Sequence, residues 1–72
     1  MMTPLESDML AACEYFPPFR RLVLQFTSGE LYAYSEVSKD LYQGLLEADS
    51  KGRFFRENIR DRLPYLKLSQ RP

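Results

Sequence analysis

Apolar and polar side chains alternate from Arg20 to Thr27, which predicts a β-strand with one apolar face. Ser28-Gly29 then supplies a turn, and the following segment ends in two tyrosines, Tyr32 and Tyr34. Because successive side chains of a strand point to opposite faces, these two tyrosines share one face. The segment therefore predicts a β-hairpin that carries a tyrosine pair.

The type of turn decides which face the tyrosines share. A two-residue type I′ turn pairs Gln25 with Tyr32 and puts the tyrosines behind the leucine face of the first strand. A three-residue loop with a G1 bulge pairs Leu24 with Tyr32 instead, which puts them on that face. Serine adopts the positive φ of a type I′ turn less readily than asparagine, so we favour the bulge.

After the hairpin, apolar residues recur with helical spacing, and Ser38 precedes them as a good N-cap. We therefore predict a helix over Ser38–Ser50. Gly44 lies inside this helix at a cost of about 1 kcal/mol relative to alanine, which suggests that another backbone approaches it. Gly52 is placed to end the helix in a left-handed C-cap.

A second, shorter helix is predicted over Arg53–Arg62, and Pro64 is expected to end it. Residues 65–68 then have the composition of a short terminal strand. Residues 69–72 are expected to be peripheral and to fray.

The N-terminal part is harder to interpret. Thr3-Pro4-Leu5-Glu6 has the form of a capping box and predicts a short helical turn within a peripheral segment, residues 1–9. Residues 10–16 are compatible with the end of that helix or with a first strand, and we favour the strand. Pro17-Pro18 rules out a helix that continues further.

At 72 residues the chain is predicted to form a single domain over 1–72. The elements indicate an α+β fold, in which a small antiparallel sheet of two or three strands (a β-meander) has two helices packed on one face. The predicted core consists of apolar positions from these elements: Leu22, Leu24, Phe26, Tyr34, Val37, Leu41, Leu45, Leu46, Phe55 and Ile59.

The composition argues against an enzyme. The chain has no histidine, no metal-ligand cluster and no phosphate loop, so we expect no cofactor and no bound metal. Carboxylate pairs such as Glu47 with Asp49 are expected to be solvated charges. The lone Cys13 is expected to be a small buried or half-buried hydrophobe, because no histidine is present to activate it. With no secretory signal and no apolar run near ~20 residues, a cytoplasmic protein without a membrane span is expected.

Charge is balanced overall but unevenly distributed. Residues 1–50 contain eight acidic and three basic side chains, whereas residues 51–72 contain two acidic and seven basic ones. Within the basic part, Lys51, Arg53, Arg56 and Arg60 are candidates for phosphate contacts. The alternative is an ordinary solvated helix face paired with nearby acids.

Tyr32 and Tyr34 are candidates for a stacking platform, because bases stack on aromatic rings of a sheet. The alternative is that both tyrosines belong to the core, with their hydroxyls at its edge.

The order of these residues resembles the KTSC domain, a short module found at the C-terminus of some lysyl-tRNA synthetases and as a stand-alone protein. The resemblance covers Tyr15 to about Tyr65. It is carried by Tyr15, Leu22-x-Leu24-x-Phe26, Gly29, Tyr32-x-Tyr34, Val37, Tyr42, Leu45-Leu46, Ala48-x-Ser50-x-Gly52, Phe55 and Ile59-Arg60. The chain departs from the family pattern at Phe16, Ser38, Arg56 and the pair Leu63-Pro64.

What the resemblance implies is a small α+β fold and an RNA-binding role without catalytic residues. The leading functional hypothesis is therefore a non-catalytic RNA-binding module, with a tRNA-like RNA as its partner. The alternative is a protein-interaction module whose oppositely charged ends meet an acidic protein surface or a second copy. The oligomeric state is left open.

Overall fold

A computed structural model describes residues 1–69 and shows one antiparallel sheet with the strand order β1-β2-β3-β4-β5. The strands are β1 (Thr3–Pro4), β2 (Leu10–Phe16), β3 (Arg21–Phe26), β4 (Leu31–Tyr34) and β5 (Tyr65–Ser69). The α+β meander was expected, but the expectation of two or three strands is wrong. The sheet has five strands because both terminal segments pair with it.

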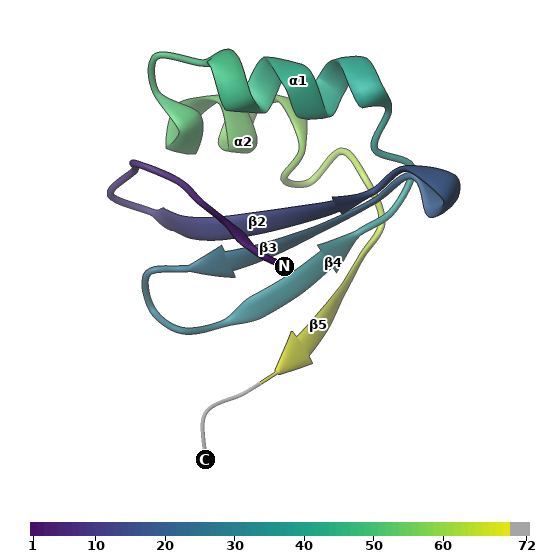
Figure 1. The fold of residues 1–72 in the computed structure, drawn as a ribbon, viewed down its shortest axis with the longest axis horizontal. Coiled ribbons are helices and arrows are strands. Elements are labelled where there is room, and N and C mark those ends of the chain that lie inside the picture. Colours follow the sequence, from purple (N-terminus) through teal and green to yellow (C-terminus); the bar gives the residue numbers. More distant parts are fainter. Residues whose placement is uncertain (70–72) are drawn as a thin grey trace.

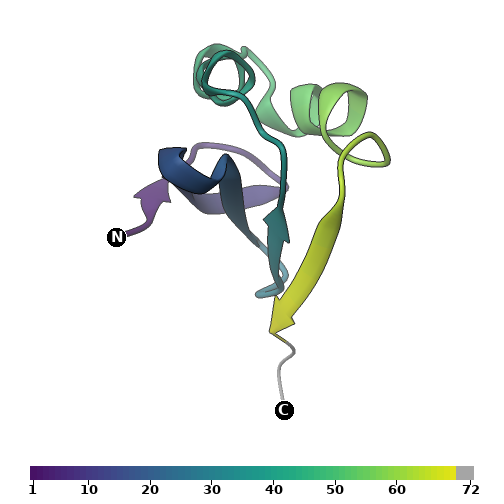
Figure 2. The ribbon, with the colours of Figure 1, turned by 90° about the vertical axis from the view of Figure 1, so that its right-hand side faces the viewer.

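Two helices, α1 (Lys39–Glu47) and α2 (Lys51–Asn58), lie on the same side of this sheet (Figures 1 and 2). The Ser38 hydroxyl caps α1 by accepting from the Leu41 amide at 3.0 Å, as predicted. The predicted C-cap at Gly52 is wrong, because Ala48 is already extended and Ser50 caps a new helix. Gly52 is instead buried within the first turn of α2.

The second helix is also shorter than predicted at its C-terminal end. It ends at Asn58, well before Pro64, so the proline does not terminate it. After α2, the Arg62 and Leu63 amides both donate to the Ile59 carbonyl, and this irregular turn leads into β5.

The β3–β4 hairpin has the bulged loop that we favoured. Leu24 pairs with Tyr32 and Leu22 pairs with Tyr34, so the tyrosines share the leucine face. Gly29 has a φ of 98°, a value that favours glycine, and its amide donates to the Phe26 carbonyl at 2.8 Å.

Both ends of the chain add edge strands. The predicted helical turn at residues 3–6 is wrong: Thr3 and Pro4 pair with β2, and a proline is compatible with an edge strand. Residues 10–16 form β2, and the predicted C-terminal strand is present as β5. The rest of the segment expected to fray, 70–72, lies outside the described residues.

The core lies between the sheet and the helices. Most predicted positions are buried there, but Phe26, Leu41 and Leu46 are only partly buried. Four buried apolar residues lie outside the predicted core list: Leu10, Ala12, Cys13 and Ala33. Of these, only Cys13 was expected to be buried or half-buried. Tyr15 joins the layers, because its ring stacks on Tyr42 at 4.5 Å and its hydroxyl donates to the Val37 carbonyl at 2.6 Å.

Gly44 is approached by a side chain rather than by a backbone. A Cβ atom added at Gly44 would lie 2.8 Å from Cζ of Phe54 on α2. The missing side chain therefore leaves room for an aromatic ring between the two helices, which explains a glycine in the interior of α1.

Candidate nucleic-acid interface

An open groove of about 380 Å³ lies on the helix side of the sheet, and most of its lining comes from α2, the turn after α2, and strands β3, β4 and β5. We call it the tyrosine groove. It is lined by Met9, Phe26, Glu30, Tyr32, Tyr34, Phe55, Arg60, Asp61 and Tyr65.

The pairing of β4 with β5 assembles the aromatic wall of this groove. Tyr34 pairs with Tyr65, and Tyr32 pairs with Lys67, so these side chains share the helix side of the sheet. The Tyr65 ring centroid lies 5.5 Å from that of Tyr32 and 5.6 Å from that of Tyr34. Tyr65 is 58% exposed and offers the most accessible ring of the three.

Tyr34 forms the floor of the groove. It is only 4% exposed and meets Phe55 edge to face, at 5.5 Å between ring centroids. Burial, and then the neighbouring Tyr32 and Tyr65, raise the pKa of the Tyr34 hydroxyl to about 12. Tyr34 is therefore a neutral core residue that borders the groove.

Tyr32 is half-buried and partly covered by a lysine. The Lys67 Nζ lies 5.9 Å from the Tyr32 ring centroid and donates to Glu30 Oε2 at 2.9 Å. This hydrogen bond lowers the pKa of Glu30 and raises the pKa of Lys67. Both groups are therefore held in their charged forms at one end of the groove.

Arg60 supplies a cation on another side of the tyrosine groove. Its amide and that of Ile59 both donate to the Phe55 carbonyl, which fixes the turn that follows α2. The Arg60 side chain is 55% exposed, and its Nε lies 4.0 Å from Asp61 Oδ2, at the limit of an ion pair. A largely exposed guanidinium thus stands beside the tyrosine rings.

The other predicted basic residues lie elsewhere. Lys51 and Arg56 line a second open hollow of about 850 Å³, together with acidic residues that include Glu6, Asp8 and Asp49. Lys51 Nζ donates to the Ala48 carbonyl at 3.2 Å. The mixture of charges makes this hollow a poor match for phosphates.

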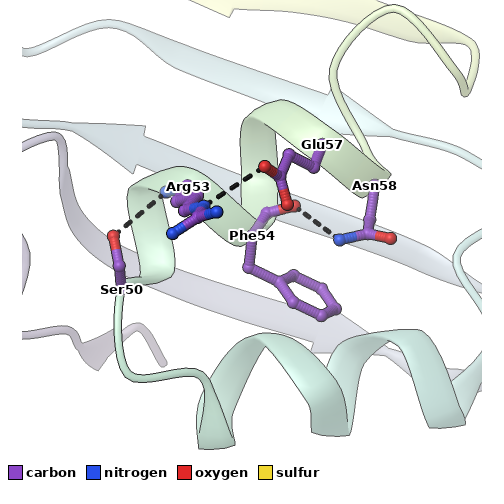
Figure 3. Close-up of polar contacts among 5 residues, drawn as sticks. All are labelled: Ser50, Arg53, Phe54, Glu57 and Asn58. Carbon is purple, nitrogen blue, oxygen red and sulfur yellow. Dashed lines mark hydrogen bonds and ion pairs between the residues drawn. The ribbon is translucent and has the colours of Figure 1, made fainter.

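Arg53 belongs to neither hollow. Its Nε donates to Glu57 Oε2 at 3.2 Å, one turn further along α2 (Figure 3). Both side chains are largely exposed, so this pair is an ordinary surface ion pair of the kind that we gave as the alternative. The structure therefore brings together Tyr32, Tyr34 and Arg60, and separates them from Lys51, Arg53 and Arg56.

Two residues of the site, Tyr65 and Lys67, were not identified from the sequence. Tyr65 and Lys67 are two residues apart, as Tyr32 and Tyr34 are, and each pairs with one of those tyrosines across the two strands. The spacing alone does not show that β5 pairs with β4, so it could not identify these two residues.

Other kinds of site have little support in the described part of the chain. Cys13 is fully buried, as expected, and burial raises the pKa of its thiol, which disfavours the reactive thiolate. Within residues 1–69, no group of three or more Asp, Glu, Cys or His side chains is arranged to hold a metal ion. Nor does any helix in this range have the length and apolar character needed to cross a bilayer.

Curated proteins from several bacteria are similar to this chain. A protein from Tsukamurella paurometabola is 39% identical over 61 residues, covering 85% of this chain and 91% of that protein. An uncharacterized protein from Stutzerimonas stutzeri is 43% identical over 53 residues, covering 74% and 75%. A lysine–tRNA ligase from Nostoc is 34% identical over 64 residues, which are 89% of this chain but only 11% of the ligase.

A solved structure has the same fold. The crystal structure of a KTSC domain protein from Yersinia pestis superposes with a TM-score of 0.92 at 30% sequence identity, covering 96% of this chain and 97% of that one. The family model of the KTSC domain matches residues 6–65, beginning nine residues before the resemblance that we traced from Tyr15. The chain is therefore a member of the KTSC domain family.

Proposed function

We propose that this chain is a non-catalytic module that binds single-stranded RNA in the tyrosine groove. In this proposal a nucleobase stacks on Tyr65, and the Arg60 guanidinium contacts a neighbouring phosphate. The observation that carries the proposal is the exposed Tyr65 ring, which lies beside two further tyrosines and an exposed arginine. Stacking on aromatic side chains of a sheet is a common way to bind unpaired bases.

The size of the groove supports a ligand of this kind. Its volume of about 380 Å³ lies in the range of small-molecule sites, and a nucleotide is a ligand of that class. Its neutral aromatic wall fits the flat face of a base, and the hydroxyls of the tyrosines offer hydrogen bonds to the base edge.

The charges around the groove predict weak, stacking-dominated binding. Arg60 and Lys67 are offset by Asp61 and Glu30, so the site has little excess positive charge. Single strands lose affinity with salt at a slope of about −0.7 per phosphate contacted, so one contact from Arg60 gives a shallow dependence. Each stacked base adds about 1–3 kcal/mol.

The relatives give independent support for RNA as the ligand class. One of them is named a lysine–tRNA ligase, so a segment like this chain is part of a protein that acts on a tRNA. The chain matches only 11% of that ligase, and the ligase activity itself is not part of the proposal. An RNA ligand is also consistent with the cytoplasmic location that we expect.

The test measures the fluorescence anisotropy of a labelled eight-nucleotide RNA with the whole chain at low and physiological salt. Loss of one stacked base predicts that Tyr65→Ala weakens binding by about five- to a hundredfold. We expect Arg60→Glu to weaken binding and to flatten its salt dependence.

The matched control is Arg53→Glu, which makes the same change of charge outside the groove. It should leave most of the affinity intact. Absence of binding at low salt, or an equal loss in Arg53→Glu and Arg60→Glu, would contradict the proposal.

A further inference from the structure

The side of the sheet opposite the helices carries an uncovered apolar surface, which we call the back face. Both helices lie on the other side (Figures 1 and 2). An open hollow of about 440 Å³ in the back face has mostly apolar walls. Those walls include Phe16, Phe19, Val23, Ala33, Leu66 and Leu68.

Strand pairing explains why these residues gather. Val23 pairs with Ala33, and Ala33 pairs with Leu66, so the three form an apolar row across β3, β4 and β5. Leu66 is 65% exposed and Leu68 is 48% exposed, so no other part of the described chain covers either side chain fully. The back face therefore carries an apolar patch outside the core, next to the charged side chains of Glu14 and Arg21.

Phe19 stands at the rim of the hollow. It is the last residue of a short 3₁₀-helix (Pro17–Phe19) between β2 and β3, and it is 66% exposed. The Arg21 guanidinium carbon lies 5.5 Å from its ring centroid. An exposed aromatic ring beside an apolar hollow is a typical anchor of a protein interface.

We propose that the back face is a homodimer interface, in which two copies of this chain pack sheet to sheet and Phe19 of each copy enters the hollow of the other. A two-fold axis makes such an interface from one self-complementary surface. Exposed apolar patches of this kind usually mark contact sites.

The charges of the back face favour a second copy as the partner. Glu14 pairs with Val23, and Arg21 pairs with Phe16, so the acid and the base lie on the same face of adjacent strands. The proposed two-fold pair would place Arg21 of one copy against Glu14 of the other. Glu14 already accepts from the Met1 amino group through Oε2, which leaves Oε1 as the oxygen offered to the partner. The chain has no net charge, so its copies do not repel one another.

The area that a stable dimer must bury can be compared with the whole surface of the chain. A stable interface buries about 800 Å² per partner, which is roughly one sixth of the 4947 Å² surface of this chain. Two sheets that pack face to face lie about 10 Å apart. The tyrosine groove lies on the opposite side, so a dimer keeps both grooves open.

Sedimentation velocity over a concentration series, without nucleic acid, tests the proposal. We expect the wild-type chain to shift from monomer to dimer as its concentration rises. Leu66→Lys and Phe19→Ser should each weaken this association by about tenfold or more. Both side chains are exposed in the monomer, so circular dichroism should show an unchanged fold.

Tyr65→Ser is the matched control, because it removes an exposed apolar residue from the other face of the same strand. It should associate like the wild type. Arg21→Glu and Glu14→Arg should each weaken association, and the double exchange should restore it. A wild-type chain that stays monomeric at millimolar concentration, or a Tyr65→Ser variant as impaired as Leu66→Lys, would overturn the proposal.

Discussion

Tyr32 and Tyr34 are two positions apart on β4, but their surroundings give them different properties. Tyr34 lies under Phe55 and is almost fully buried, so its hydroxyl is held neutral. Tyr32 is half-buried beside Phe26 and below Lys67. Sequence spacing predicted that they share a face, but exposure depends on α2 and β5, which are distant in sequence.

The raised pKa of Tyr34 has a measurable consequence at high pH. An unfolded tyrosine ionises near pH 10, whereas Tyr34 in the folded chain keeps its proton until about pH 12. Stability from Tyr34 is therefore complete below pH 10 and is lost as the pH rises toward 12. Tyr34→Phe should lose less stability than the wild type between pH 9 and 11.5, as measured by urea unfolding. Equal losses in the two proteins would contradict the assigned burial of the hydroxyl.

At the scale of elements, local signals predicted the β3–β4 hairpin and the start of α1, because the turn residues and the Ser38 cap act within a few positions. A local signal of the same kind, the capping box at residues 3–6, wrongly predicted a helical turn. A two-residue strand has no periodicity of its own, and its pairing with β2 overrides the capping box. The prediction of one helix that ends at Gly52 failed in a similar way. The chain is extended at Ala48, and Ser50 caps a second helix, so two short helices form here instead.

The close approach of α1 and α2 predicts an unusual response to substitution of Gly44. Alanine should favour an isolated helix by about 1 kcal/mol, but its Cβ would lie 2.8 Å from the Phe54 ring. We therefore expect Gly44→Ala to be neutral or destabilising in the wild type and stabilising by about 1 kcal/mol in a Phe54→Ala background. Urea unfolding of the four proteins gives the coupling energy. A coupling near zero would show that the ring does not need the space left by glycine.

At the scale of the whole molecule, the two sides of the sheet differ in structure. The helix side holds the core and the tyrosine groove, whereas the back face carries an apolar patch that no helix covers. The sequence predicted Tyr32, Tyr34 and Arg60 as site residues, but it placed Arg60 together with Arg53 and Arg56 on one helix, with Lys51 nearby. The fold separates these groups because α2 ends at Asn58 and Arg60 lies in the turn beyond it. Tyr65 and Lys67 could be found only through long-range pairing.

The most direct test of the central claim is an amide NMR titration of the labelled whole chain with a short single-stranded RNA, at low and then physiological salt. Binding in the tyrosine groove predicts shifts that cluster on residues 60–67 and on Tyr32, and these shifts should weaken only modestly with salt. An unchanged spectrum at low salt, or shifts confined to residues 51–56, would contradict the account.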